Sequence, residues 1–494
     1  MEAGAETRRK LVEKALREGY SISGEALEAL NRLENPLQAL RRILNYLREK
    51  EPNTLVIEVR HLEELETPPN PEKEPTEYLQ EPVLAQIPEL QVDERFLKFY
   101  RIEGKTEEFK RYFSSRYEKL LKLLQRRGLS FLSTSSVRGI KQGQEAVLSL
   151  MLLEKRETRK ALILEGEDSS GFIRLIVPKR SQRLFQEASL ILPDSVFGAR
   201  VTRLNDSFLV KELFLPDAPI GGGGKASEAP ETYLCLVSDL HVGSRKFRRD
   251  LWESFLDWIN RGRDPEAKRV RHLVIAGDLV DGVGIFPGQR WELEYTSVKK
   301  QLEEAAELLR DIPSHIKIIL SPGNHDPVER ALPQPPLTGD YRRILEKVRD
   351  DLVFVGNPAW IELGGRRILI YHGQSFDDII QALPNVSYNT LQKDVGNVLE
   401  SVIRHRHLAP IYGGNTPILP LPEDLLVLEK LPNIIHSGHI HVAYAGTYRD
   451  IKLVNTGTWQ EQTSYQRSMG LEPTVGTIAI VNLKTLSLKL KKFT

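Results

Sequence analysis

The sequence predicts a multidomain protein in which an N-terminal helical module and a small β-barrel precede a larger α/β domain. Two stretches rich in proline, glycine or charge, residues 67–100 and 216–230, lie where linkers between domains are expected. Between them, short β-rich runs alternate with turn residues, and beyond the second stretch apolar runs end in polar clusters. The chain has 494 residues, 40% of them hydrophobic, which is enough for more than one full-sized core.

Residues 1–66 make up the predicted helical module. Ser23 is expected to cap the helix GEALEALNRLE, and Asn35 to cap a second helix that has Pro36 in its first turn. Apolar residues recur at helical spacing in that second helix, at Leu37, Leu40, Ile43, Leu44 and Leu47. An ordinary helical domain explains this pattern best, with a docking module as the alternative. Residues 67–100, which include TPPNPEKEPTEYLQEP, predict an extended linker.

Residues 101–215 predict a helix followed by a small antiparallel barrel. The helical stretch EEFKRYFSSRYEKLLKLLQRRG precedes the β-rich runs AVLSLMLL, KALILEG and GFIRLIV, which are separated by turn signals such as EDSSG. An oligonucleotide-binding (OB) barrel fits this spacing. Because no strand face carries a stack of aromatic residues, a structural role is favoured over nucleic-acid binding. The linker PDAPIGGGGKASEAP, residues 216–230, then leads into the α/β domain at residues 231–494.

Composition limits the classes of partner and location. Lys and Arg number 69 against 68 Asp and Glu, so nucleic-acid binding would need local basic patches rather than a strong overall field. The N-terminal residues lack an apolar signal core and no segment has the length of uncharged apolar sequence that spans a bilayer, so we expect a cytoplasmic protein without a membrane partner. The single cysteine, Cys235, excludes an internal disulfide and is expected to be a buried packing residue in YLCLV.

Five apolar runs of the α/β domain each end in residue types that bind metals. They are YLCLV before Asp239 and His241, HLVIA before Asp278 and Asp281, IKIIL before Asn324, His325 and Asp326, RILI before His372, and NIIHS before His439 and His441. Each motif alone has an ordinary explanation, such as a turn for GNHD, but the ordered set within one domain is specific. Because loops at the carboxyl ends of neighbouring strands converge, these side chains can form one site.

Three further histidines compete for a place in this set. His405 and His407 follow a helical stretch and lie beside arginines, which suits a solvated or phosphate-facing loop, whereas His372 ends a clean β-run. His372 is therefore the favoured ligand, with His405 or His407 as the alternative. For His436, a core or supporting role is favoured over metal ligation.

The order D-x-H, GDxxD, GNHD, a strand-end His and GHxH resembles the calcineurin-like metallophosphoesterase superfamily. The resemblance covers residues 231–494 and implies a sandwich of two β-sheets flanked by helices. It also implies one metal ion held by Asp239, His241 and His441, a second held by Asn324, His372 and His439, and Asp278 as the bridge between them.

Two divalent ions are expected at such a site. Mixed imidazole and oxygen ligands suit Mn, Fe or Zn better than Mg or Ca. Two ions about 3.5 to 4 Å apart need a bridging carboxylate, which is the role of Asp278. His325 is the candidate to stabilise the transition state or protonate the leaving oxygen, with Asp326 orienting it. Asp281 is expected to support a ligand.

Basic residues near these motifs predict contacts to a polyanionic backbone. The candidate DNA-binding residues are Arg245, Lys246, Arg248, Arg404 and Arg406. A solvated helix face is the alternative interpretation.

The arrangement of the whole chain resembles the small subunits of archaeal family D DNA polymerases. The resemblance runs from about residue 130 onward and is carried by RALPQPPLTGDY, YHGQSFDDII, RHLAPIYGG and LVNTGTWQEQTSYQ. It implies a metal-dependent 3′–5′ DNA exonuclease that proofreads for a separate large catalytic subunit at single-stranded or mismatched 3′ ends, in association with the nucleoid. It also implies Mn²⁺ as the metal, with Fe, Zn and Mg as alternatives. A sliding clamp or primase is a further expected partner. A mainly architectural subunit with weak nuclease activity and a stand-alone metallophosphatase are the alternatives.

Overall fold

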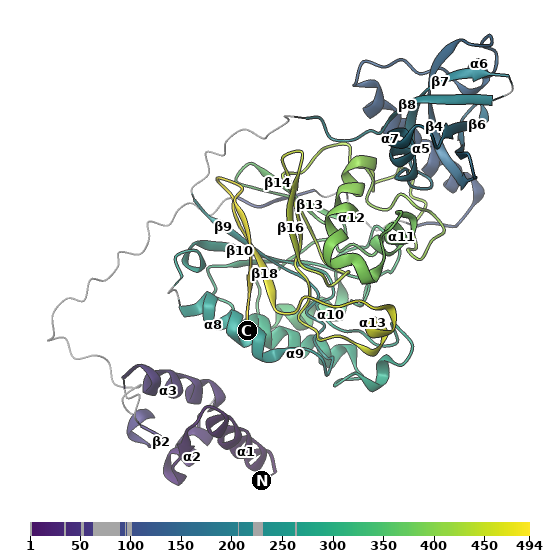
Figure 1. The fold of residues 1–494 in the computed structure, drawn as a ribbon. Helices are drawn as coiled ribbons and strands as arrows, with labels where there is room; N and C mark the ends of the chain where they lie inside the picture. The colour runs from purple at the N-terminus through teal and green to yellow at the C-terminus, as the bar shows by residue number, and fades with distance from the viewer. Residues whose placement is uncertain are drawn as a thin grey trace. The chain divides into compact units, whose positions relative to one another are not determined.

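The computed structural model divides the chain into two compact units, Met1–Val83 and Leu84–Thr494 (Figure 1). It describes residues 2–33, 36–50, 54–62, 89–93, 95, 101–205, 207–220, 231–261 and 264–494. The multidomain organisation expected from the sequence is confirmed, whereas the individual boundaries stay predictions. Asn35 and most of the two predicted linkers lie outside the described residues. Within the described part of the chain, we find no helix that combines the length and the apolar character needed to cross a membrane.

Helices make up most of the described part of the smaller unit. They are α1 (Glu2–Arg17), α2 (Gly24–Asn31) and α3 (Pro36–Lys50), and the short strands β1 (Ser21–Ile22) and β2 (Val56–Ile57) pair in parallel. Ser23 caps α2 as predicted, since its hydroxyl oxygen accepts a 3.2 Å hydrogen bond from the Ala26 N–H. The predicted helix is confirmed as α3, and its apolar residues from Leu40 to Leu47 lie in the core, whereas Leu37 in its first turn is 39% exposed.

Five strands close into a barrel in the larger unit. They are β4 (Glu145–Glu157), β5 (Ala161–Asp168), β6 (Gly171–Pro178), β7 (Val196–Leu204) and β8 (Ser207–Phe214), in the order β4-β5-β6-β8-β7. Alternate residues of β4, namely Leu148, Leu150 and Leu152, point inward and are fully buried. Helices α5 (Thr106–Gln125) and α6 (Thr134–Arg138) precede the barrel, and α7 (Gln182–Ser189) connects β6 to β7. The predicted barrel is confirmed, but it is not wholly antiparallel, because β6 and β8 pair in parallel.

Two six-stranded sheets face each other in the rest of the larger unit. The first has the order β12-β11-β10-β9-β18-β19 and the second β16-β17-β15-β14-β13-β3. Their strands are β3 (Gln91–Val92), β9 (Tyr233–Val237), β10 (Val270–Ala276), β11 (Lys317–Ser321), β12 (Val353–Phe354), β13 (Ala359–Leu363), β14 (Arg366–Ile370), β15 (Ile434–Ser437), β16 (Tyr444–Tyr448), β17 (Ile451–Asn455), β18 (Thr477–Asn482) and β19 (Leu488–Lys492). Strands β9 to β12 run parallel, as do β14, β15 and β17, so their carboxyl ends share one edge of each sheet.

Alternation along the strands separates three apolar layers. On β9, Leu234 and Leu236 belong to the core between the sheets, whereas Cys235 and Val237 pack toward helices. Helices α8 (Arg249–Arg261), α9 (Val298–Arg310) and α10 (Gly339–Glu346) cover the outer face of the first sheet, and α11 (Phe376–Ala382) and α12 (Leu391–His405) cover that of the second (Figure 1). Cys235 is buried as predicted.

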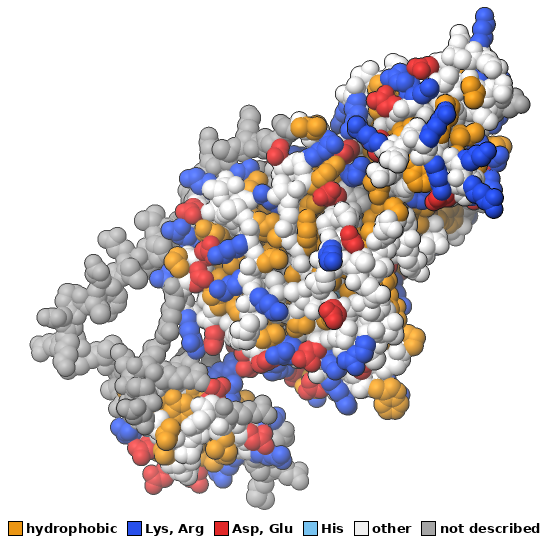
Figure 2. Space-filling model, in the orientation of Figure 1, with side chains coloured by type: hydrophobic (Ala, Val, Ile, Leu, Met, Phe, Trp, Pro, Cys, Tyr) orange, Lys and Arg blue, Asp and Glu red, His pale blue; other side chains and the backbone are white. Residues whose placement is uncertain are grey.

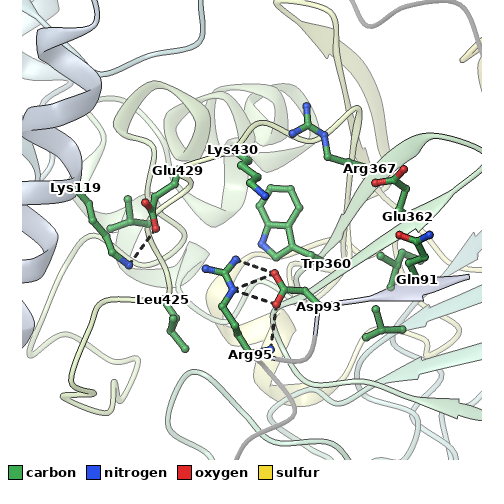
Figure 3. Close-up of a pocket in the computed structure, with 13 residues that line it drawn as sticks. Gln91, Asp93, Arg95, Lys119, Trp360, Glu362, Arg367, Leu425, Glu429 and Lys430 are labelled. Atoms are coloured by element: carbon green, nitrogen blue, oxygen red, sulfur yellow. Dashed lines mark hydrogen bonds and ion pairs between the residues drawn. The ribbon is translucent and has the colours of Figure 1, made fainter.

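The described parts of both predicted linkers pack against the larger unit. Strand β3 pairs antiparallel with β13, and the adjacent Asp93 pairs with Arg95 at 2.8 Å beside a pocket of about 410 Å³ that contains Trp360 (Figure 3). In the second linker, Asp217 is buried and pairs with Arg449 at 2.9 Å. A two-residue strand pairing in the first segment and a buried ion pair in the second therefore attach these proline-rich segments to the larger unit.

Candidate metal centre

The seven predicted ligands meet where the two sheets present the carboxyl ends of their strands. Asp239 and His241 follow β9, Asp278 follows β10, Asn324 follows β11, His372 follows β14, and His439 and His441 follow β15. The carboxyl ends of these strands lie together at one edge of the two sheets. Residues about 200 positions apart in the sequence therefore come into contact.

Left-handed backbone conformations collect at these positions. The φ angles are 52° at Asp239, 53° at His241, 51° at Asp278, 69° at His439 and 55° at His441. Residues with a β-carbon rarely adopt such angles, and they persist only where the surroundings determine them. Here the N–H groups of Asp239 and His241 donate to the carbonyls of Gly277 and Asp278, both at 3.0 Å. Strain of this kind is characteristic of functional sites.

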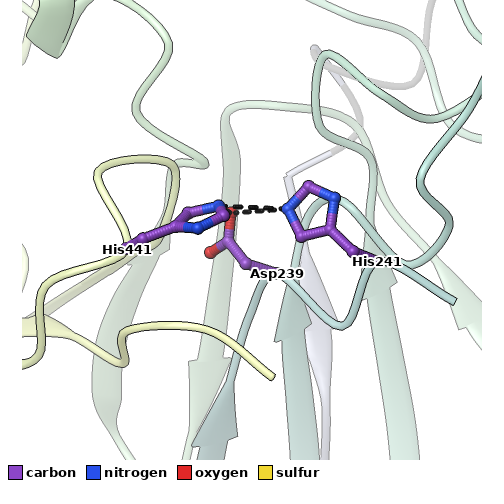
Figure 4. A group of neighbouring side chains, drawn as sticks. All are labelled: Asp239, His241 and His441. Atoms are coloured by element: carbon purple, nitrogen blue, oxygen red, sulfur yellow. Dashed lines mark hydrogen bonds and ion pairs between the residues drawn. The ribbon is translucent and has the colours of Figure 1, made fainter. Parts of the chain in front are cut away.

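Asp239, His241 and His441 form the first cluster (Figure 4). The Nε2 atoms of the two imidazoles are 3.0 Å apart, and His441 Nε2 is 3.3 Å from Asp239 Oδ1. The other ring nitrogen of His241 contacts Asp281 Oδ1 at 3.0 Å, which is the supporting role expected for Asp281. Two ring nitrogens and a carboxylate oxygen that converge on one point suit a divalent transition metal.

A second cluster adjoins the first through Asp278. His372 Nε2 lies 3.2 Å from Asp278 Oδ2 and 3.1 Å from Asn324 Oδ1, and His439 Nδ1 lies 3.0 Å from the same amide oxygen. Asp278 Oδ2 is also 3.8 Å from His241 Nε2 in the first cluster. Asp278 therefore lies between the two donor sets, as a bridging carboxylate would.

Two glycines allow the backbone to approach the carboxylates. A β-carbon at Gly323 would lie 2.2 Å from Asp278 Oδ1, and one at Gly438 would lie 2.1 Å from Asp239 Oδ2. Any other residue would displace these carboxylates, so the two glycines are part of the centre.

The negative charge of the buried carboxylates in the clusters is balanced by neighbouring imidazoles. Burial raises the pKa of Asp278, yet the imidazoles of His372 and His325 hold it well below its usual range. Burial lowers the pKa of His372, but Asp278 raises it to about 10. The buried carboxylates thus require positive charge beside them, and the chemistry of the donor set fits divalent ions in that place.

His325 and Asp326 differ in their orientation from the prediction. His325 faces the centre, with Nε2 3.9 Å from Asp278 Oδ2, and its Nδ1 is 2.7 Å from the carbonyl oxygen of Asp281. Asp326 instead accepts hydrogen bonds from the N–H groups of Gly323 at 2.8 Å and Val280 at 3.2 Å. The assignment of Asp326 as the residue that orients His325 is therefore wrong, because its carboxylate ties two loops together and the Asp281 carbonyl holds the imidazole.

Sequence reasoning missed two supporting side chains. Asp377 Oδ2 is 2.9 Å from His439 Nε2 and accepts a 2.7 Å hydrogen bond from the Tyr388 hydroxyl through its other oxygen. The Gln466 side-chain nitrogen is 2.8 Å from His441 Nδ1. The stretch SFDDII offers two adjacent carboxylates, and no spacing signal shows which of them reaches the metal centre.

A cleft of about 220 Å³ opens onto the centre. Polar groups of both clusters, including His241, Asp278 and Asn324, line its floor. Its walls are apolar or aromatic and include Ile285, Phe286, Ile440, Tyr465, Met469 and Leu471. A substrate in this cleft would contact both the candidate metal ligands and apolar side chains.

The alternative histidines lie away from this centre. His405 and His407 are both 1% exposed, so the predicted solvated loop is wrong for them. His407 Nε2 is 2.8 Å from Asp424 Oδ2, and His405 Nδ1 donates to the Ser401 carbonyl at 2.8 Å. His436 is fully buried, in agreement with a core role.

Acid is expected to destabilise the protein through His405. Burial lowers its pKa to about 4, and its Nε2 accepts a hydrogen bond from the Leu192 N–H at 3.3 Å, which protonation would break. Since an unfolded histidine titrates near pH 6.5, the unfolded chain gains protons first as pH falls, and stability is lost between about pH 6.5 and 4. From pH 7 to 4.5 the loss should be about 2 to 3 kcal/mol for this group. Urea denaturation at both pH values should show a smaller loss for His405→Gln, and equal losses would contradict the assignment.

The predicted DNA-binding residues separate into two groups. Arg406 is 4% exposed and donates to the carbonyls of Leu428 at 2.7 Å and Glu429 at 3.0 Å, so the prediction of a phosphate contact there is wrong. The half-buried Arg404 is likewise not among the described residues that line the cleft.

Arg245, Lys246 and Arg248 lie closer to the centre. Phe247 pairs with Gln460, whose side-chain nitrogen contacts Asp281 Oδ1 at 2.9 Å. Arg245 is exposed, whereas Arg248 is paired with Asp250 at 2.6 Å and Glu461 at 3.1 Å. Charges of both signs are interspersed over the visible face of the larger unit, which offers no broad basic field (Figure 2).

Comparison with known proteins places the chain in a family. A sequence profile that describes the B subunit of DNA polymerase alpha/epsilon matches residues 234–445. A protein of Archaeoglobus fulgidus named DNA polymerase II small subunit is 38% identical, over 76% of this chain and 75% of that protein. One of the same name from Pyrococcus furiosus is 35% identical over 76% of this chain and 61% of that protein, so this chain spans less than two thirds of its length. A solved structure described as a novel archaeal phosphodiesterase covers 53% of this chain and 99% of its own at 12% identity, but a TM-score of 0.27 supports no inference. The chain belongs to the family of archaeal DNA polymerase II small subunits.

Proposed function

We propose that this chain is a metal-dependent 3′–5′ exodeoxyribonuclease that proofreads as the small subunit of a family D DNA polymerase. The main support is that seven potential metal ligands converge at one place. Two groups of three lie on either side of Asp278, namely Asp239, His241 and His441, and Asn324, His372 and His439. In this proposal the α/β domain is a calcineurin-like metallophosphoesterase and the barrel an OB fold. The large catalytic subunit is the partner, a sliding clamp or primase is a further one, and the nucleoid is the location.

The donor set assigns the residues that would hold two divalent ions, with Mn²⁺ as the expected metal. Asp239, His241 and His441 would hold one ion, Asn324, His372 and His439 the other, and Asp278 both. Such ions, when bound, supply Lewis-acid polarisation of a phosphodiester and activation of water. Asp281 and Asp377 orient the imidazoles of His241 and His439 from behind.

His325 would move a proton at its Nε2 atom. Its Nδ1–H donates to the Asp281 carbonyl, so Nε2 is the nitrogen that faces Asp278 and the cleft. When Nε2 also carries a proton, taken up from the attacking water, the imidazolium can protonate the leaving 3′ oxygen or donate a hydrogen bond to the phosphoryl group. Arg245 and Lys246 would contact the DNA backbone at the rim.

An architectural role is the second candidate. The buried ion pair of Arg116 with Asp424, 2.7 Å long, fixes α5 beside the barrel to the loop that leads into β15. A rigid link of this kind suits a platform for other subunits. A stand-alone metallophosphatase would use the same donor set without needing the barrel.

The His325→Ala variant tests the nuclease. The purified chain with Mn²⁺ should shorten a 5′-labelled DNA single strand from its 3′ end. Chelator should abolish the ladder by removing the metal, and His325→Ala should abolish it while metal content and folding are retained. Full activity in the variant would remove His325 from this role. If wild type stays inactive even with the large subunit added, the architectural function replaces the nuclease.

A further inference from the structure

The aromatic wall of the cleft is not explained by metal binding. Phe286 and Tyr465 come from segments far apart in the sequence, yet their rings stack with centroids 5.5 Å apart and planes 24° apart. Phe286 lies 6.5 Å from the His325 ring, measured between centroids. Tyr465 remains 45% exposed, so part of its ring is open to a ligand.

Both aromatic residues are held by side chains that also hold the metal centre. On one side, Gln289 accepts a hydrogen bond from the Ile285 N–H at 2.9 Å and donates to Asp281 Oδ2 at 3.1 Å. On the other, Tyr465 precedes Gln466, which contacts His441 Nδ1. The Ser464 N–H donates to Glu292 Oε1 at 3.0 Å and so ties helix α13 (Ser464–Met469) to the loop that carries Phe286. The stack is therefore fixed relative to the donor clusters.

We propose that Phe286 and Tyr465 form a platform on which the nucleobase of the scissile 3′-terminal nucleotide stacks; this rests on the proposed function. Every nucleobase has an apolar π-face, so an aromatic platform binds all four bases without reading sequence. The neighbouring Ile285, Met469 and Leu471 extend the apolar wall, which suits a base rather than a phosphate. The backbone phosphate would then lie toward His325 and the donor clusters.

This platform gives the site a means of selecting its substrate. A base within a duplex is already paired and stacked, and moving it onto the platform requires the loss of those contacts. The loss is smallest at a mismatched or single-stranded end. The site would then prefer such ends because less free energy is needed to move the terminal base out of the helix, and no side chain needs to contact the mismatch itself.

Removal of the base from the substrate tests the platform. The full chain with Mn²⁺ would be given 5′-labelled single strands that end in a normal or an abasic 3′ nucleotide. Stacking of one base on an aromatic side chain corresponds to a factor of about 5 to 150 in cleavage rate, so wild type should cleave the normal end faster than the abasic end by such a factor. In Tyr465→Ala the ratio should fall toward one, and Tyr465→Phe should restore it. Tyr341→Ala, a change at an exposed tyrosine on α10, is the matched control and should keep the wild-type ratio.

A binding readout separates this proposal from the nuclease itself. In the His325→Ala background, a 3′-terminal 2-aminopurine should lose fluorescence on binding, and adding Tyr465→Ala should prevent the loss. An equal rate on normal and abasic ends, an unchanged ratio in Tyr465→Ala, or loss of cleavage of both ends in that variant would each overturn the platform. Absence of cleavage of either strand by wild type would instead count against the proposed function.

Discussion

Asp278→Asn is expected to abolish DNA cleavage and to remove both metal ions. Its carboxylate contacts His372 at 3.2 Å and lies 3.8 Å from His241, so both donor clusters depend on its charge. An amide keeps the shape but carries no negative charge to offset two divalent cations. Metal-ion stabilisation of several kcal/mol corresponds to a rate loss of about a thousandfold or more.

The measurement pairs activity with metal content. Exonuclease rates and the metal-to-protein ratio after dialysis against Mn²⁺ would be compared for wild type, Asp278→Asn and Asp340→Asn, a control that removes a charge from an 85% exposed carboxylate on α10. The control should match wild type in both. Two retained ions in Asp278→Asn would show that Asp278 is not the bridge.

The sequence predicted where the candidate ligands would meet because the rule behind it is geometric. The carboxyl ends of parallel strands lie at one edge of a sheet, so five strand-end motifs implied that their side chains would converge, and in the structure the seven candidate ligands do so. Their division between two metal ions came from the superfamily resemblance and stays a proposal. Supporting residues obey no such rule. Asp377 and Asp378 are adjacent carboxylates on α11. The turn after His372 sets the direction of this helix and so brings Asp377 to His439, which the sequence alone does not show.

The wrong predictions arose mainly from assigning a residue's role or exposure from its neighbours in the sequence. Asp326 follows His325 directly, but the turn sends its carboxylate toward the N–H groups of other loops. Arg406 lies between two histidines, a context that predicts an exposed cation. It ends α12 with a left-handed φ of 54°, and this conformation places its guanidinium on buried carbonyls. Local polarity predicts exposure poorly where tertiary contacts satisfy the polar group.

Arg116→Ala is expected to give the largest loss of stability, about 3 to 5 kcal/mol. Arg116 and Asp424 are both fully buried, and the guanidinium also donates to the carbonyls of Pro410 at 2.5 Å and Asp194 at 3.2 Å. Truncation leaves Asp424 charged and buried, without its cationic partner and with the side chains of His407 and Tyr112 as neighbours. Because this pair joins α5 to the α/β domain, the loss should appear first as exposure of α5.

Hydrogen exchange of α5 and urea denaturation would measure this effect. Arg111→Ala, on the exposed face of the same helix, is the control and should change stability by less than about 0.5 kcal/mol. The double variant Arg116→Met with Asp424→Leu removes both charges together and should recover most of the loss, since an apolar pair avoids the cost of an unpaired buried charge. If the double variant is as unstable as Arg116→Ala, the loss arises from packing of the arginine side chain and its carbonyl contacts rather than from the stranded carboxylate.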